Sequence, residues 1–284
     1  MEIKKVGVIG CGTMGGGIAQ VCAQSGYQVV VSEINETLLN KGLAAINTFL
    51  TRSVERGRMK QEEKDATISH LKGTTNMQDF SDCDLVIEVV VENMDLKKKI
   101  FTELDKICPK EAILATNTSC LSVIDMATVT KRPDKVLGIH FYNPVPLMKL
   151  CEIVKTIATS DDTLETAKKF GTSVGKSIVV AKDAPGFIVN RLMIPFILNA
   201  IRMLDAGVAS KEDIDTGINL GLNHPMGPLT LTDLIGLDTC HFIANAIYDE
   251  FKDPQYASPP LLKKMVTAGW LGRKTGKGFY EYNK

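Results

Sequence analysis

Several features that would point to particular classes of protein are missing from this sequence. The 284-residue chain carries 33 basic and 33 acidic residues and so has no net charge. A balanced chain has no general affinity for nucleic acid or for an anionic membrane, and any anion site must be a local cluster. No apolar run approaches the roughly 18 residues that a membrane-spanning helix needs. We therefore predict no nucleic-acid partner and no membrane partner.

The cysteines do not form a recognisable framework. The chain has seven, an odd number, and no two of them stand in a C-x-x-C pair. This spacing is typical neither of a zinc site nor of a disulfide scaffold, and we predict no bound metal. Most of these cysteines are expected to be small buried side chains in a reducing compartment. An apolar strand begins almost at the N-terminus and leaves no room for a signal peptide, so the expected location is cytoplasmic.

The most informative motif that is present lies in the first 15 residues. A short apolar run at 6–9 leads into glycines spaced G-x-G-x-x-G, and a helical pattern follows. In a dinucleotide-binding unit these glycines permit a tight turn, close approach to a pyrophosphate and close helix–strand packing. The pyrophosphate then faces the positive end of the helix. The residues of this cofactor loop are Gly10, Gly12, Thr13, Met14 and Gly15.

A second apolar run, at 27–31, follows the helix and ends in Ser32 and Glu33. A carboxylate at this point can accept hydrogen bonds from both hydroxyls of a ribose, and it repels a 2′-phosphate. We therefore predict a dinucleotide site that prefers NAD(H) to NADP(H). The alternative is a plain βαβ unit in which the glycines only make turns.

Residues 36–72 have the periodicity of a helix, with apolar side chains at three- and four-residue steps. Four basic residues lie within nine positions of its second half: Arg52, Arg56, Arg58 and Lys60. Spacing alone favours the solvated end of a helix, which is what most charge runs are. The other interpretation is an anion site for the phosphorylated tail of a substrate.

Further strand candidates alternate with helical patterns. The strand candidates are 85–87, 112–115, 136–139, 151–153 and 177–180, and the helical patterns include 95–106 and 122–128. This alternation predicts a doubly wound, mostly parallel sheet. Polar residues gather just after the strands: Glu92, Ser119, His140 and Asn143. In an open α/β sheet such positions line the crevice where ligands bind.

The pattern changes at residues 183–186. Downstream the chain is helical: an apolar helix is expected over 187–204, a second behind a capping box at Ser210, and a third that Asp238 caps and that runs to Phe251. We therefore predict a Rossmann-type α/β domain over residues 1–184 and an all-helical domain over 185–284.

One histidine, His140, directly follows a predicted strand of the first domain. Glu152 comes twelve residues later among apolar side chains, where a carboxylate needs a partner. A His140–Glu152 pair would hold the imidazole in one orientation and favour its charged form. An alternative of equal weight is that His140 only satisfies hydrogen bonds in the core. Asn190, a polar residue in an apolar helix start, either makes a packing hydrogen bond or reaches from the second domain into the crevice.

Together these motifs closely resemble the short-chain L-3-hydroxyacyl-CoA dehydrogenases along the whole chain, and the chain length is most similar to that of bacterial 3-hydroxybutyryl-CoA dehydrogenases. The resemblance is carried by V-I-G-C-G-T-M-G at 8–15, A-T-N-T-S at 115–119, H-F-Y-N-P at 140–144, C-E-I-V at 151–154, D-A-P-G-F-I-V-N-R at 183–191, P-M-G-P at 225–228 and K-T-G-K-G-F-Y at 274–280. The glycine motif is common, whereas H-F-x-N-P and P-G-F-x-x-N-R are far more specific.

The resemblance implies an NAD-dependent enzyme that interconverts (S)-3-hydroxybutyryl-CoA and acetoacetyl-CoA. It implies that His140 is the general acid and base, that Glu152 orients and charges it, and that Ser119 and Asn190 bind the reacting oxygen and the thioester. The implied NAD contacts are Gly10, Gly12, Thr13, Met14, Gly15, Glu33, Glu92, Lys97, Ser119, Asn143 and Lys274. Glu33 is one methylene longer than the Asp that relatives often have there.

The resemblance also bears on the substrate and on assembly. Arg56, and less closely Arg52, match basic residues that meet the CoA phosphates, which favours the anion-site interpretation of the helix end. The helical domain forms the dimer in this family. Two rival functions remain: a dehydrogenase of free hydroxy acids such as sugar acids on the same scaffold, and a non-catalytic protein that only binds the cofactor.

Overall fold

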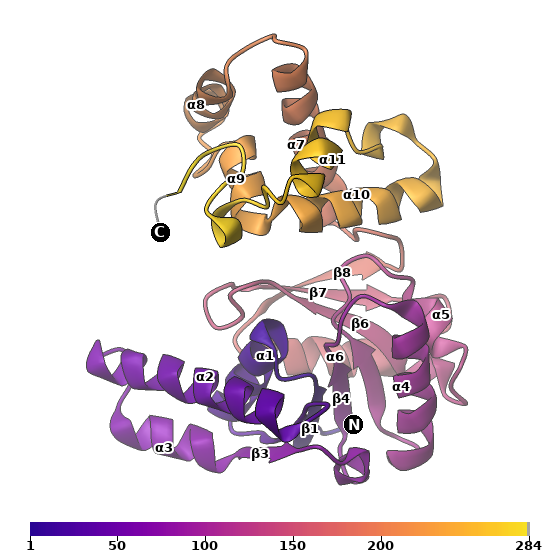
Figure 1. Ribbon diagram of the computed structural model, residues 1–284. Helices are drawn as coiled ribbons and strands as arrows, with labels where there is room; N and C mark the ends of the chain where they lie inside the picture. The colour runs from indigo at the N-terminus through magenta and orange to yellow at the C-terminus, as the bar shows by residue number, and fades with distance from the viewer. Residues whose placement is uncertain (283–284) are drawn as a thin grey trace. The chain divides into compact units, whose positions relative to one another are not determined.

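The computed structural model describes residues 1–282 (Figure 1). The chain divides into two compact units, with the boundary between Ala184 and Pro185. The first unit is a sheet flanked by helices, and the second is built of helices. The predicted fold class, a Rossmann-type sheet followed by a helical region, is therefore confirmed.

Eight strands form one sheet in the first unit. They are β1 (Lys5–Ile9), β2 (Gln28–Ser32), β3 (Leu71–Thr74), β4 (Leu85–Glu88), β5 (Ile113–Thr116), β6 (Val136–Phe141), β7 (Leu150–Lys155) and β8 (Ser177–Lys182). Their spatial order is β3-β2-β1-β4-β5-β6-β7-β8. Every pairing is parallel except that of β6 with β7. The first six strands thus have the order of a dinucleotide-binding sheet.

Helices connect the strands of this unit. They are α1 (Thr13–Gln24), α2 (Glu36–Glu55), α3 (Gln61–Ser69), α4 (Met94–Ile107), α5 (Val123–Ala127) and α6 (Asp161–Ser173), with short 3₁₀ turns at Met77–Phe80 and Pro133–Lys135. Consecutive residues of β2, Val29–Val31, are all buried, which shows that both faces of the strand are covered. Parallel strands buried in this way require near-continuous apolar runs, and this is what made the strands visible in the sequence.

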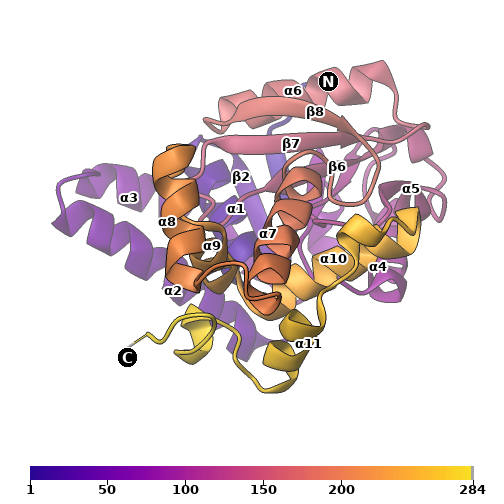
Figure 2. The ribbon, with the colours of Figure 1, turned by 90° about the horizontal axis from the view of Figure 1, so that it is seen from above.

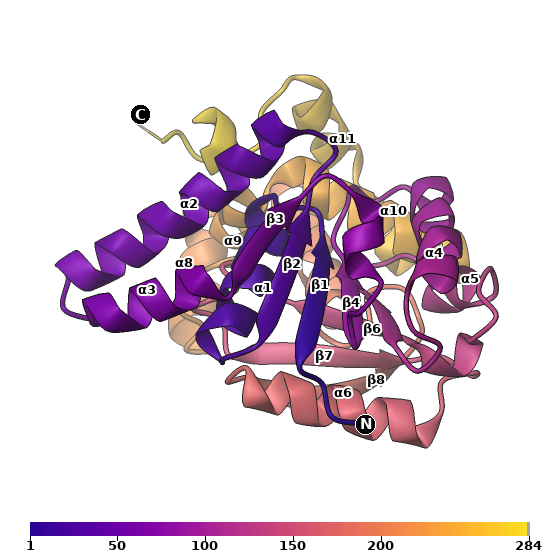
Figure 3. The ribbon, with the colours of Figure 1, turned by 90° about the horizontal axis from the view of Figure 1, so that it is seen from below.

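The prediction of one helix over 36–72 is wrong. Helix α2 ends at Glu55, and Gly57 adopts a left-handed conformation (φ +65°) that stops the helix. The chain then reverses into α3, which Glu63 helps to start by accepting a hydrogen bond from the Lys60 amide (2.7 Å). Figure 3 shows α2 and α3 side by side at the β3 edge of the sheet. The apolar steps are confined to α2, whereas Gln61–Ser69 is mostly polar, so the predicted helix extended beyond the residues whose spacing supported it.

The second unit contains α7 (Val189–Asp205), α8 (Lys211–Gly221), α9 (Pro228–Ile235), α10 (Leu237–Phe251) and α11 (Pro260–Thr267), with 3₁₀ turns at Pro254–Tyr256 and Arg273–Thr275. Helix α7 packs against α8, α9 and α10 (Figure 2). Ser210 caps α8 by accepting a hydrogen bond from the Asp213 amide, as predicted (3.1 Å). The prediction that Asp238 caps α10 is wrong: Gly236 (φ +105°) joins α9 to α10, and Asp238 lies inside the first turn.

Two further observations concern the chain as a whole. Among the helices of residues 1–282, none has the length and apolar character needed to cross a bilayer.

All seven cysteines are buried and carry free thiols, which confirms the expectation for most of them. Burial raises the pKa of Cys11 to about 11 and that of Cys83 to about 12, so these thiols stay protonated and unreactive at neutral pH.

Candidate active site

The centre of the site is a histidine–carboxylate pair across two antiparallel strands. The register of β6 and β7 places His140 directly opposite Glu152. The imidazole Nδ1 lies 2.7 Å from Oε2 of Glu152, and the two side chains are 4% and 0% exposed. A carboxylate oxygen accepts the Nδ1 proton, so the neutral ring keeps a lone pair on Nε2. The predicted contact between these two residues is confirmed, and it leaves Nε2 as the basic atom.

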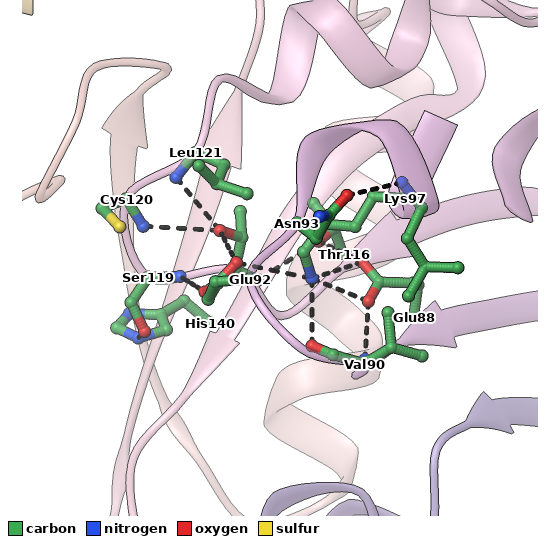
Figure 4. A network of polar contacts seen from close by, with 12 residues as sticks. Glu88, Val90, Glu92, Asn93, Lys97, Thr116, Ser119, Cys120, Leu121 and His140 are labelled. Atoms are coloured by element: carbon green, nitrogen blue, oxygen red, sulfur yellow. Dashed lines mark hydrogen bonds and ion pairs between the residues drawn. The ribbon is translucent and has the colours of Figure 1, made fainter. Parts of the chain in front are cut away.

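Ser119 lies on the other side of the imidazole. It follows β5, and its Oγ is 3.1 Å from Nε2 of His140 (Figure 4). Its backbone amide donates to Oε1 of Glu92 (2.9 Å), and the neighbouring Thr118 hydroxyl donates to Oε2 of the same carboxylate (2.8 Å). Glu92 therefore anchors the loop that presents the Ser119 hydroxyl to the histidine.

A buried ion pair supports this loop. The Lys97 ammonium lies 2.7 and 2.9 Å from the two carboxylate oxygens of Glu88, 3.3 Å from the carbonyl oxygen of Val90 and 3.5 Å from Glu92 (Figure 4). Glu88 also accepts a hydrogen bond from the Thr116 hydroxyl (2.7 Å). Lys97 is 1% exposed and Glu88 is fully buried. The contact of Lys97 with NAD stays a prediction, whereas its contact with these carboxylates is a feature of the fold.

Sequence reasoning did not assign Glu88 to the site. The signal was a charged residue that directly ends the apolar run of β4, a position that becomes the carboxyl edge of a parallel sheet. Tyr142 was also missed. Its hydroxyl donates to Oε2 of Glu152 (2.6 Å), and its ring centroid lies 4.7 Å from that of His140. Here the signal was the two-residue spacing from His140, which places both side chains on one face of an extended chain.

The glycine loop has the geometry that a bound pyrophosphate requires. Gly10 has φ +101°, and a side chain there would meet the carbonyl oxygen of Val89. A β-carbon on Gly15 would overlap the carbonyl oxygen of Gly10, whereas one on Gly12 would have no atom within 4 Å. The loop is thus closed toward the protein and open at Gly12. Helix α1 begins at Thr13, and amides of a first helical turn have no acceptor within the helix.

A 420 Å³ cleft adjoins this loop within the first unit. Its lining includes Gly12, Thr13, Glu33, Asn143 and, from α2, Phe49. The Glu33 carboxylate is held in place, because Oε1 accepts a hydrogen bond from the Cys11 amide (2.9 Å) and Oε2 accepts one from the Ile34 amide (3.1 Å). The residues of this unit therefore fit a dinucleotide: open amides for its phosphates, and a carboxylate for a ribose.

The other predicted residues lie elsewhere. Arg52 is in the last turn of α2 and Arg56 follows it, and both are exposed. Within residues 1–282 neither guanidinium forms an ion pair. Asn190 and Lys274 belong to the second unit. Asn190 is the second residue of α7 and is 6% exposed, and Lys274 forms an ion pair with Asp238 (2.6 Å).

The sheet order, the open glycine loop and a histidine with one basic nitrogen define an NAD-dependent dehydrogenase of the Rossmann type. Residues 5–184 match the family described as "3-hydroxyacyl-CoA dehydrogenase, NAD binding domain", and residues 186–282 match "3-hydroxyacyl-CoA dehydrogenase, C-terminal domain". The chain belongs to the 3-hydroxyacyl-CoA dehydrogenase family, which confirms the resemblance seen in the sequence.

Individual relatives agree with this assignment over their full lengths. The 3-hydroxybutyryl-CoA dehydrogenase of Clostridioides difficile is 49% identical over 280 residues, which cover 99% of this chain and 100% of that protein. The crystal structure of FadB2 from M. tuberculosis has a TM-score of 0.98 and 46% identity, and that of (S)-3-hydroxybutyryl-CoA dehydrogenase PaaH1 from Ralstonia eutropha has 0.96 and 43%. Each structural match covers 100% of both chains.

Proposed function

We propose that this protein interconverts (S)-3-hydroxybutyryl-CoA and acetoacetyl-CoA with NAD(H) as the cofactor. The observation that carries the proposal is the His140–Glu152 pair, 2.7 Å across β6 and β7, with the Ser119 hydroxyl 3.1 Å from the other imidazole nitrogen. Similarity to relatives named 3-hydroxybutyryl-CoA dehydrogenase supports the choice of substrate.

The proposed chemistry assigns one task to each side chain. NAD⁺, when bound, accepts a hydride from C3 of the substrate. In oxidation Nε2 of His140 takes the proton of the 3-hydroxyl group, and in reduction it returns that proton to the 3-oxo group. Glu152 holds the Nδ1 proton and balances the positive charge that develops on the ring. Ser119 donates a hydrogen bond to the reacting oxygen, and Asn190 donates one to the thioester carbonyl.

The proposed cofactor site is centred on the glycine loop and the cleft beside it, and it includes residues that do not line this cleft. Its residues are Gly10, Gly12, Thr13, Met14, Gly15, Glu33, Glu92, Lys97, Ser119, Asn143 and Lys274. Glu33 is the basis for selectivity, because its carboxylate repels a 2′-phosphate next to the ribose. We expect kcat/KM to be higher with NADH than with NADPH, and equal or greater efficiency with NADPH would contradict this role.

The two units receive separate roles in this proposal. Residues 1–184 bind NAD, and the α2–α3 pair within them meets the CoA phosphates through Arg56 and Arg52. Residues 185–284 supply Asn190 and the dimer contact. Exposed apolar side chains on the second unit, Leu192 (71%) and Leu220 (81%), support an interface there, since such surface is normally covered. Seven free buried thiols support a reducing location, for which we propose the cytoplasm.

Turnover of three reaction mixtures tests the function. NADH absorbance is followed with acetoacetyl-CoA, with free acetoacetate and with neither. We expect oxidation of NADH with acetoacetyl-CoA alone. Equal turnover of the free acid would favour a hydroxy-acid dehydrogenase, and NADH binding without any turnover would favour a cofactor-binding protein that is not an enzyme. Substrates of four, six and ten carbons then define the preferred chain length.

A further inference from the structure

Tyr142 makes a contact that neither the cofactor nor the substrate explains. Its hydroxyl donates to Oε2 of Glu152 (2.6 Å), the same oxygen that lies 2.7 Å from Nδ1 of His140. One carboxylate oxygen thus receives two donors, the imidazole and the phenol. The Tyr142 ring also packs against the imidazole, with the planes inclined at 57°. The residue therefore touches both members of the proposed acid–base pair.

We propose that Tyr142 is a positioning residue that limits how strongly Glu152 charges His140 and thereby sets the pH range of the reaction. This inference rests on the proposed function, in which His140 is the general acid and base. A hydrogen bond from a neutral hydroxyl withdraws part of the negative charge that the carboxylate otherwise directs at the ring.

The hydroxyl is a permanent donor. Burial, followed by the hydrogen bond to Glu152, raises the pKa of Tyr142 above its ordinary range. Tyr142 therefore stays neutral over the range in which an enzyme works, and its effect on Glu152 does not itself change with pH. Any change of activity with pH in this range then reflects the pair rather than the phenol.

Other titratable groups of the first unit lie near this pair. On β7, burial raises the pKa of Cys151 to about 12, so its thiol is neutral, and the residue of β8 opposite Glu152 is Val179. Glu92 accepts a hydrogen bond from the Ser119 amide and lies 3.5 Å from the Lys97 ammonium. Lys176, whose charge acts on Cys151, donates to the carbonyl oxygens of Val145 and Met148. Removal of the Tyr142 hydroxyl changes none of these groups and acts directly on Glu152, which accepts its hydrogen bond.

Tyr142→Phe removes one atom and keeps the ring against the imidazole. Glu152 then attracts a proton on His140 more strongly, so the imidazole is protonated at higher pH. Because oxidation requires the neutral base, the acidic limb of kcat/KM for 3-hydroxybutyryl-CoA should move upward by about half a pH unit. Reduction requires the charged acid, so its basic limb should move upward by the same amount. The KM for NADH should stay unchanged.

A matched control removes a tyrosine hydroxyl just before β2, at the amino end of that strand. Tyr27 precedes β2, and its hydroxyl lies 2.5 Å from Oγ of Ser173. Tyr27→Phe should leave both limbs in place. NADH binding shows that each variant is folded. Because phenylalanine keeps the ring and removes only the donor, any change reports the loss of the hydroxyl.

Titration of the His140 imidazole by ¹⁵N NMR separates this inference from the proposed function, since it requires no substrate. We expect the midpoint to rise by about half a pH unit in Tyr142→Phe relative to wild type and to Tyr27→Phe. An unchanged or lower midpoint would overturn the role of Tyr142 even if acetoacetyl-CoA is turned over. A wild-type protein that binds NADH but does not turn over acetoacetyl-CoA would instead overturn the proposed function.

Discussion

Two regions of this molecule concentrate charge, and they do so in opposite ways. At the carboxyl edge of the sheet, Lys97, Glu88 and Glu152 are at most 1% exposed, and each contacts a partner of opposite charge or a donor. At the end of α2, Arg52 and Arg56 are exposed and form no ion pair within the described chain. Buried charges must be paired because desolvation is costly, whereas exposed ones need no partner in the protein.

The comparison shows that burial, rather than residue type, determines what a charged side chain can do. A buried pair has a fixed geometry, so it can position a proton or a loop, and losing one member is costly. An exposed guanidinium contributes little to stability, but it is free to meet an anionic ligand and is screened by salt. The expected effects of mutation therefore differ in size and in kind between the two regions.

The largest effect is expected at His140. His140→Ala should lower kcat by about 10²- to 10⁴-fold, the usual contribution of a positioned acid–base group, while NADH still binds. The kcat of Glu152→Gln should also be strongly reduced, because a neutral amide does not balance the charge of an imidazolium. The control is His70→Ala. His70 directly precedes β3 and contacts the carbonyl oxygen of Ala23, and this variant should keep near-normal turnover. If the fold-loss of kcat in the double variant equalled the product of the two single fold-losses, His140 and Glu152 would act separately.

The second effect concerns stability. Lys97→Met leaves the buried Glu88 carboxylate without its counter-ion and should lower the free energy of unfolding by about 3–5 kcal/mol, measured by urea denaturation. Lys168→Met is the matched control, because its pair with Glu165 is 38% and 55% exposed and should contribute at most about 1 kcal/mol. Adding Glu88→Gln to Lys97→Met should recover part of the loss. Equal losses of unfolding free energy in Lys97→Met and Lys168→Met would contradict the distinction between buried and exposed charges.

The smallest effect is expected at the exposed helix end. Arg56→Ala should raise KM for acetoacetyl-CoA by roughly three- to tenfold with kcat little changed, because contacts far from C3 are the same in ground and transition states. Added salt should shrink the difference. Arg58→Ala, in the same cluster, should have a weaker effect. With acetoacetyl-pantetheine, which lacks the nucleotide phosphates, Arg56→Ala and wild type should behave alike, and equal impairment with both substrates would return the cluster to a solvated helix end.

Local patterns were enough to predict one part of this protein. The strand, glycine loop and helix of residues 5–24 follow from backbone sterics and apolar spacing, which act between near neighbours. His140 and Glu152 were also predictable as a pair, because a carboxylate among apolar side chains needs a partner and His140 follows a predicted strand of the same domain. Specific motifs then supplied the family, which composition alone did not.

The tertiary structure decided the rest. Gly57 ends α2 and sends the chain back toward β3, a reversal that the apolar spacing of α2 did not indicate. The pairing of Lys97 with Glu88 arises because α4 folds back over the end of β4, and Tyr142 reaches Glu152 only through the antiparallel register of β6 and β7. These contacts depend on which strands become neighbours. That choice is made by burial of the whole sheet and not by any short stretch of sequence.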